Sequence, residues 1–78
     1  MASFCKIIDL PLGEQVLVMK SYDDEEGKEI LQLFTDFDGS IASVKLGFIN
    51  EKKRDNSFDE YWLDNAIEFR NSVAQFYE

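Results

Sequence analysis

The C-terminal third of the chain carries an apolar stripe with the spacing of one helical face. Apolar side chains recur every three or four residues, at Phe58, Trp62, Ala66, Phe69, Val73 and Phe76. Ser57 and Glu60 have the spacing of a capping box, in which each side chain can bond a free amide of the first turn. The sequence therefore predicts one amphipathic helix over residues 58–77, with Ser57 as its N-cap and Trp62 in the core.

The first fifty residues read as strands separated by turns. Strand patterns cover 4–10, 14–22, 30–37 and 40–49, and Pro11 and Gly13 interrupt the first two. A helix with several aromatic side chains needs a broad apolar partner, which only these strands can supply. We expect a single α+β domain over residues 1–78, with a four-stranded, mainly antiparallel sheet in chain order and the helix packed on one face. The pairing of the first strand stays open.

Asp38 and Gly39 form a candidate two-residue type I′ turn, which fixes the register of the last two strands. One face then carries a nearly apolar set, on which we expect the helix to dock: Leu31, Leu33, Val44 and Leu46. The other face carries a mixed set of pairs: Phe34 with Ser43, Gln32 with Lys45, and Ile30 with Gly47. Gly47 is expected to mark a bulge or a close contact opposite Ile30.

The second and third strands have apolar residues on both faces, and one helix cannot cover both. Either the sheet curls on itself or another chain covers the second face, because large exposed apolar patches are uncommon on monomers. We expect that second face to bind a protein, and the flank of the helix could extend the contact. The candidate interface residues are Ile30, Phe34, Ile41 and Tyr61.

Composition narrows the partners and the compartment. A net charge of −8 disfavours direct binding to nucleic acid or an anionic membrane, and no run is long and apolar enough for a membrane span. The basic cluster 52–54 is expected to be a solvated turn. The first residues do not resemble a signal peptide, and the single cysteine, Cys5, is expected to be a small buried hydrophobe. Together these features predict a cytoplasmic protein.

The sequence offers little chemistry for catalysis or for ligands. There is no histidine, which removes the commonest general base and a frequent metal ligand. Placing Gly39 at the invariant glycine of a calcium loop puts Phe34 and Lys45 at ligand positions, so the hairpin interpretation is preferred. Asp64 and Glu68 are expected to be solvated. We predict no catalytic residue, cofactor or metal site. One acidic run forms a candidate patch, at Asp23, Asp24, Glu25 and Glu26.

Two functions fit these observations. The first is a small acidic, non-enzymatic protein-interaction domain that self-associates as a homodimer through the sheet face opposite the helix. The alternative is an acidic nucleic-acid mimic that inhibits a DNA- or RNA-binding protein and could come from a mobile genetic element. An enzyme is the least supported class, because the chain has few residues with which to build a pocket.

Overall fold

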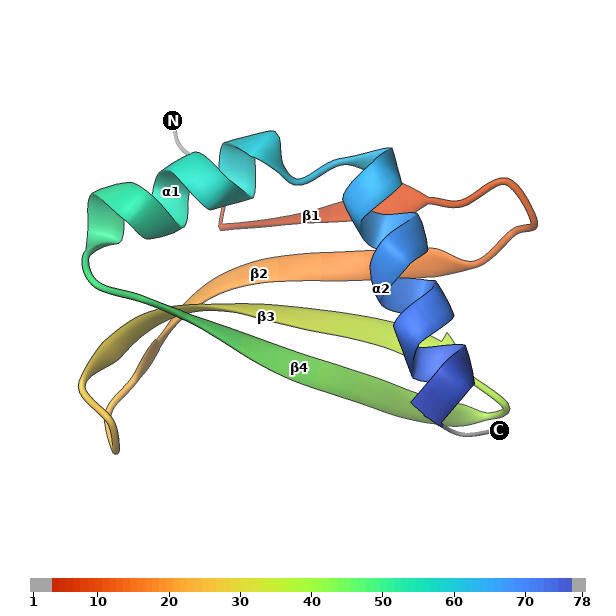
Figure 1. Ribbon diagram of the computed structural model, residues 1–78, viewed down its shortest axis with the longest axis horizontal. Helices are drawn as coiled ribbons and strands as arrows, with labels where there is room; N and C mark the ends of the chain where they lie inside the picture. The colour runs from red at the N-terminus through yellow and green to blue at the C-terminus, as the bar shows by residue number, and fades with distance from the viewer. Residues whose placement is uncertain (1–3, 77–78) are drawn as a thin grey trace.

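A computed structural model describes residues 4–76 as an open antiparallel sheet with two helices on one side (Figure 1). The strands are β1 (Cys5–Asp9), β2 (Gln15–Asp23), β3 (Lys28–Phe37) and β4 (Ser40–Phe48), and the helices are α1 (Glu51–Glu60) and α2 (Leu63–Phe76). The sheet order is β1-β2-β3-β4, with every neighbouring pair antiparallel. The expected α+β class and sheet order are confirmed, and β1 pairs with β2.

The register predicted from the last hairpin is also confirmed. Phe37 faces Ser40 across the turn, and the five further pairs predicted for the two faces all occur. Asp38 and Gly39 have φ values of 52° and 82°, and a type I′ turn requires positive φ at both positions. A short turn with this twist fixes which side chains share a face of β3 and β4.

The single predicted helix is wrong, because the segment forms two helices, the first of which begins earlier than predicted, at Glu51. Asn50 is the N-cap of α1, and its side-chain oxygen accepts a hydrogen bond of 2.9 Å from the amide of Lys53. Ser57 lies inside α1 and caps nothing. Residues 52–54, expected to be a solvated turn, are the first turns of α1. The expected helix end at 77 lies outside the described residues.

The chain breaks between the helices because its own side chains can satisfy the exposed amides there. Tyr61 is extended, with φ −81° and ψ 110°. The amide of Trp62 donates to the side-chain oxygen of Asn65 at 3.2 Å, and the carbonyl of Trp62 accepts from the amide of Ala66 at 3.0 Å. Asn65 thus bonds back to the residue that precedes α2, as the N3 residue of a capping box does.

The end of α1 is held by side chains from the break itself and from β1. The indole nitrogen of Trp62 donates to the carbonyl of Asp59 at 2.8 Å. Lys6 of β1 donates to the carbonyl of Phe58, and its ammonium lies 3.8 Å from the centre of the Trp62 ring. A cation suits the negative end of a helix dipole and the face of an aromatic ring. Burial, which outweighs the charge of Asp59, lowers the pKa of Lys6.

The core lies between the helices and one face of the sheet. It contains Ile8, Leu10, Val16, Val18, Leu31, Leu33, Ala42, Phe58, Tyr61, Ala66, Phe69 and Val73. The helices therefore pack on the predicted face, but Val44 and Leu46 of β4 remain 41% and 37% exposed. Trp62, expected in the core, is 58% exposed, and Tyr61 is buried at the break instead. The apolar residues from Phe58 to Phe76 do not form one helical face, because the backbone turns between α1 and α2.

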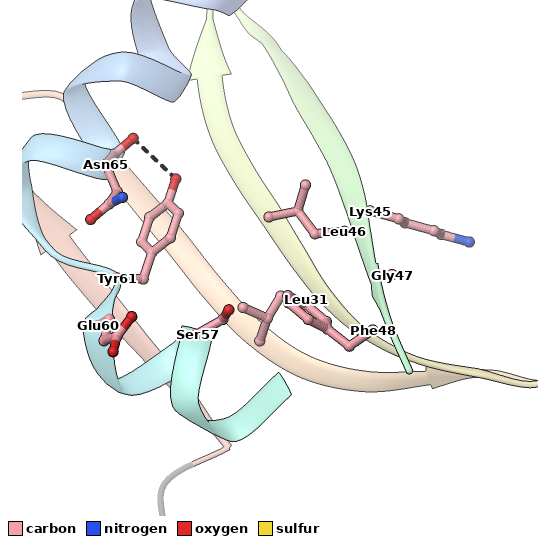
Figure 2. A pocket seen from close by; sticks show the side chains of 9 residues that line it. All are labelled: Leu31, Lys45, Leu46, Gly47, Phe48, Ser57, Glu60, Tyr61 and Asn65. Carbon is pink, nitrogen blue, oxygen red and sulfur yellow. Dashed lines mark hydrogen bonds between the residues drawn. The ribbon is translucent and has the colours of Figure 1, made fainter. Parts of the chain in front are cut away.

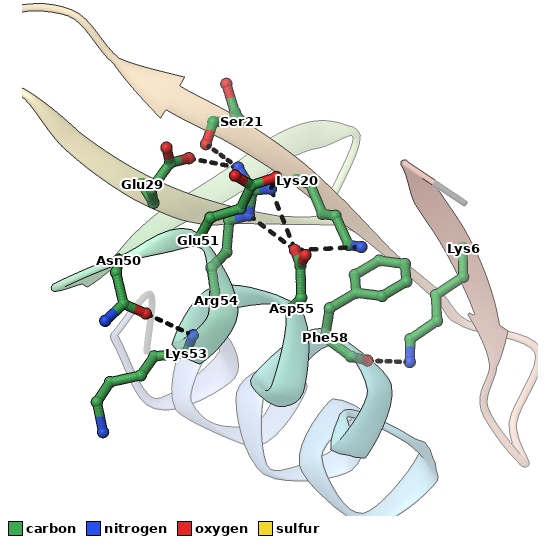
Figure 3. A network of polar contacts seen from close by, with 10 residues as sticks. All are labelled: Lys6, Lys20, Ser21, Glu29, Asn50, Glu51, Lys53, Arg54, Asp55 and Phe58. Carbon is green, nitrogen blue, oxygen red and sulfur yellow. Dashed lines mark hydrogen bonds and ion pairs between the residues drawn. The ribbon is translucent and has the colours of Figure 1, made fainter. Parts of the chain in front are cut away.

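A group of charged side chains attaches α1 to the centre of the sheet (Figure 3). Arg54 pairs with Glu29 of β3 and donates to the carbonyl of Ser21 of β2 at 3.2 Å. Asp55 accepts from Arg54 at 3.1 Å and from Lys20 of β2 at 3.2 Å. The side chain of Arg54 is only 12% exposed, so its charge depends on these partners.

The same contacts set the ionisation of Asp55. Burial is the largest single influence and acts to raise its pKa. The hydrogen bonds and positive charges of Arg54 and Lys20 together outweigh it and hold the pKa of Asp55 below its usual value. The ionised carboxylate is therefore the form that the folded protein favours.

Replacing the cap residue should destabilise the protein. We expect Asn50→Ala to reduce the free energy of unfolding by about 1 kcal/mol, because the amide of Lys53 loses its acceptor. Asn56→Ala is the matched control, since Asn56 is exposed inside α1. Urea denaturation followed by circular dichroism measures both. Equal stability of the two variants would contradict the cap assignment.

Two aromatic residues of the helical segment should respond differently to truncation. Phe58 is 5% exposed, so Phe58→Ala should cost about 3 kcal/mol or more, as emptied aromatic core sites do. Trp62→Ala should cost less than half of that, because the Trp62 ring is mostly in solvent and loses chiefly its contacts with Lys6 and Asp59. Thermal or urea unfolding measures the stability lost in each variant. A larger loss for Trp62→Ala than for Phe58→Ala would indicate that Trp62 belongs to the core.

The stabilising effect of Asp55 should depend on pH. Because its folded pKa is lowered, the contribution is complete above the unfolded pKa of about 3.9 and is lost as the pH falls through the folded value. Asp55→Asn should therefore lower the urea midpoint at pH 7, and the difference from wild type should shrink below about pH 3.9. Asp24→Asn, in the exposed β2–β3 turn, removes the same charge as a control. A difference independent of pH would refute the charge-based explanation.

Candidate interaction surfaces

The sheet face turned away from the helices is uncovered within residues 4–76, and its centre is apolar. Ile7 pairs with Leu17, and Leu17 pairs with Phe34, so these three side chains form one row across β1, β2 and β3. Met19 belongs to the next row, and Ile41 to the row on the other side. We call this surface the open face and define it by Ile7, Leu17, Met19, Phe34 and Ile41.

Charges on this side of the sheet lie around the apolar row rather than in it. Asp36 stands in the row of Ile41, and Asp9 stands beyond Ile7 at the same end of the strands. Lys45 lies toward the opposite end, paired with Gln32. The open face therefore has the carboxylates of Asp36 and Asp9 at one end and Lys45 toward the other, where the Asp23–Lys28 pair also lies, with apolar side chains between them.

The four predicted interface residues separate into two groups. Phe34 is half-buried and Ile41 is 70% exposed, and both lie on the open face. Ile30 is only 5% exposed, although its side chain has the parity of this face. The β3–β4 pairing stays regular through Gly47, so the bulge expected there as one of two possibilities does not form. A Cβ atom at Gly47 would lie 3.5 Å from the side chain of Lys28. Ile30 therefore offers little surface to a partner.

Tyr61 is also unavailable to a partner. Its ring is in the core at 8% exposure, and its hydroxyl donates to the carbonyl of Asn65 at 3.2 Å. Burial, with a smaller effect from the charge of Glu68, raises the pKa of Tyr61 to about 12. The side chain is a neutral hydrogen-bond donor at neutral pH. Its expected place on the flank of a long helix was wrong because the helix ends at Glu60.

A second surface lies on the helix side, where the helices leave β4 partly uncovered. A hollow of about 510 Å³ opens between β4 and the break in the helical segment (Figure 2). A neighbouring hollow of about 300 Å³ lies between β4 and the end of α2. We call the two together the β4 groove. Its principal lining residues are Val44, Leu46 and Phe48 of β4, with Tyr61, Phe69 and Val73 opposite.

The sequence could not reveal the β4 groove. Its strand side follows from the alternation of β4, but its other side depends on the break at Tyr61 and the direction that α2 then takes. The one available signal was Asn65, three residues after Trp62, which is the spacing of a cap. The longer apolar stripe concealed that signal.

The acidic run forms a compact turn. A carboxylate oxygen of Asp23 accepts from the amides of Glu25 and Glu26 at 3.0 and 3.3 Å. The amide of Gly27, at φ +66°, bonds the carbonyl of Asp23 at 2.7 Å, and Glu26 lies 3.7 Å from Lys28. At least part of this charge therefore serves the turn itself.

Other groups singled out in the sequence remain apart. Cys5 is exposed at the edge of the sheet, so its expected burial was wrong; β1 is an edge strand and Cys5 is its first residue. Asp64 and Glu68 are exposed on α2. Over the described residues, no three metal-ligating side chains gather into a site. Neither helix is long and apolar enough to cross a membrane.

Comparison with known proteins adds no relative. No protein-family model matches the chain, and neither a curated protein nor a solved structure is significantly similar to it.

Proposed function

We propose that this chain is a small, non-enzymatic protein-interaction domain that forms a homodimer by packing the open faces of two copies together. The observation that carries the proposal is the row of Ile7, Leu17 and Phe34, which no described part of the chain covers. Ile7 is 61% exposed, and burying its apolar surface against a second copy would lower the free energy. A reducing cytoplasm would suit a chain whose one cysteine is exposed.

The size of the face is sufficient for a stable contact. The molecule measures 33 × 27 × 16 Å, and the sheet spans its broad side (Figure 1). A standard interface buries roughly 800 Å² on each partner, which such a face can provide. Two sheets that pack face to face keep their strands within about 30° of each other and interdigitate their side chains.

The charges of the face favour a particular arrangement of the two copies. A two-fold axis that reverses the strand direction brings the Lys45 end of one face over the Asp36 end of the other. The same rotation places the two apolar rows against each other. Opposite charges then meet at the edge of the contact, where they select orientation more than they add affinity.

The acidic-mimic hypothesis stays a prediction of the sequence. No contact among residues 4–76 favours it over a solvated, structural role for the β2–β3 turn, in which Asp23 bonds two backbone amides. It nevertheless predicts a different response to salt. Binding through carboxylates should weaken steeply above ~0.15 M salt, whereas apolar self-association should change little.

The proposal is tested by placing a charge in the apolar row. Wild-type protein at tens of micromolar should sediment as a dimer, and Phe34→Glu should sediment as the 9.1 kDa monomer. Ile41→Glu should shift the same equilibrium with less risk to the fold, because Ile41 is 70% exposed. Analytical ultracentrifugation gives the masses, and circular dichroism checks the fold.

Leu12→Glu is the matched control, since Leu12 is 88% exposed in the β1–β2 turn and outside the open face. It should remain dimeric. Wild-type protein that is monomeric throughout the micromolar range, or Phe34→Glu protein that stays dimeric, would refute this proposal.

A further inference from the structure

The two edges of the sheet differ in how well they are protected. β1 has five residues, two of them charged, and its Lys6 is held by α1. β4 has nine residues with Lys45 as its only charge, no proline, and a regular register along its length. Its outer side has no strand partner among residues 4–76. Long, regular edges with few charges readily pair with another strand.

The edge of β4 coincides with the β4 groove. Alternate residues of β4, from Ala42 to Phe48, point to the helix side, and Val44 and Leu46 remain 41% and 37% exposed there. Figure 2 shows the hollow between Leu46 and the side chains of Tyr61 and Asn65. A strand added beside β4 would therefore extend the floor of a hollow that already exists and that Leu46 and Phe48 make partly apolar. Strand addition obtains affinity from main-chain hydrogen bonds and specificity from pockets for alternate side chains.

We propose that β4 binds an extended segment of another protein as a fifth strand of the sheet. Alternate apolar side chains of that segment would face the β4 groove, and the side chains between them would be lysine or arginine. This surface is separate from the open face and does not depend on the proposed dimer. Face-to-face packing leaves the edges of both sheets accessible.

Charge decides between a basic segment and a second copy of this chain. Glu60 and Lys45 are both among the residues that line the larger hollow, but the side chain of Lys45 points away from it (Figure 2). Glu68 lies beside Phe69 on the side of α2 that borders the groove. The whole chain carries −8. Pairing of two β4 strands would bring two sets of these carboxylates together, which is unfavourable, whereas a basic segment is attracted to them.

A synthetic peptide tests the backbone part of the proposal. The probe is a fluorescein-labelled heptapeptide, Lys-Leu-Lys-Val-Lys-Leu-Lys, measured by fluorescence anisotropy at 0.15 M salt. One derivative is N-methylated at the apolar residues and a second at three of the lysines. With the apolar side chains toward the groove, only one of these sets of amides can face β4. One derivative should bind at least tenfold more weakly than the other, whereas equal binding of both would refute strand addition.

A pair of protein variants tests the position. Val44→Lys should weaken binding of the unmethylated peptide at least tenfold, because Val44 faces the groove. Ile41→Lys adds the same charge on the other side of β4, outside both hollows, and should change binding less than threefold. Phe76→Lys, at an 81% exposed position lining the smaller hollow, serves if Val44→Lys does not fold.

The outcomes also separate this proposal from the dimer. Phe34→Glu protein should bind the peptide as wild type does, whatever its mass. Equal binding by the Val44→Lys and Ile41→Lys proteins would refute the groove. If folded Val44→Lys protein sediments with a lower mass than the wild type, a second copy of the chain occupies the β4 edge. That result would also overturn the proposal of a basic partner segment.

Discussion

An open sheet has two faces, and the helices within residues 4–76 cover only one of them (Figure 1). The helices comprise ten and fourteen residues, and both pack on the face that carries Leu31 and Leu33. The other face keeps apolar side chains in its central row, so burial is incomplete in the single copy. Both proposed surfaces follow from this shortage of cover: the open face has no helix, and the β4 groove is where the helices end.

The break between α1 and α2 is the adjustment that allows such short helices to cover a four-stranded sheet. α1 is attached to β2 and β3 through Arg54 and Asp55, and α2 then crosses the strands in a different direction (Figures 1 and 3). Phe58 and Phe69 can both be buried because the backbone turns between them. The cost of the turn is small, since Asn65, Trp62 and Lys6 bond the backbone groups that it exposes.

The sheet could be predicted from the sequence because its determinants are local. Asp38 and Gly39 fix one register, and a one-residue error there would turn every side chain of β4 to the wrong face. The face opposite the helices was likewise predictable from strands that are apolar on both sides. Phe34 and Ile41 could be assigned to it from their parity alone.

The helical segment could not be predicted in the same way because two signals compete within it. The stripe from Phe58 to Phe76 favours one long helix, while Asn50 and Asn65 provide caps for two shorter ones. Caps acting together with packing on the sheet decide the outcome, and packing depends on contacts distant in sequence. The exposure of Trp62, the burial of Tyr61 and the β4 groove all follow from that choice.

The order of the elements also matters while the chain is being made. All four strands precede the helices, so a growing chain can complete the hairpins of the sheet before α1 and α2 are available. At that stage Val16, Val18 and Leu33 are as accessible as the open face, and the nascent sheet is apolar on both sides. Within residues 1–50 the acidic residues outnumber the basic ones, and four of them form a continuous run. Repulsion between these acidic residues on neighbouring chains opposes aggregation during the interval before the helices fold.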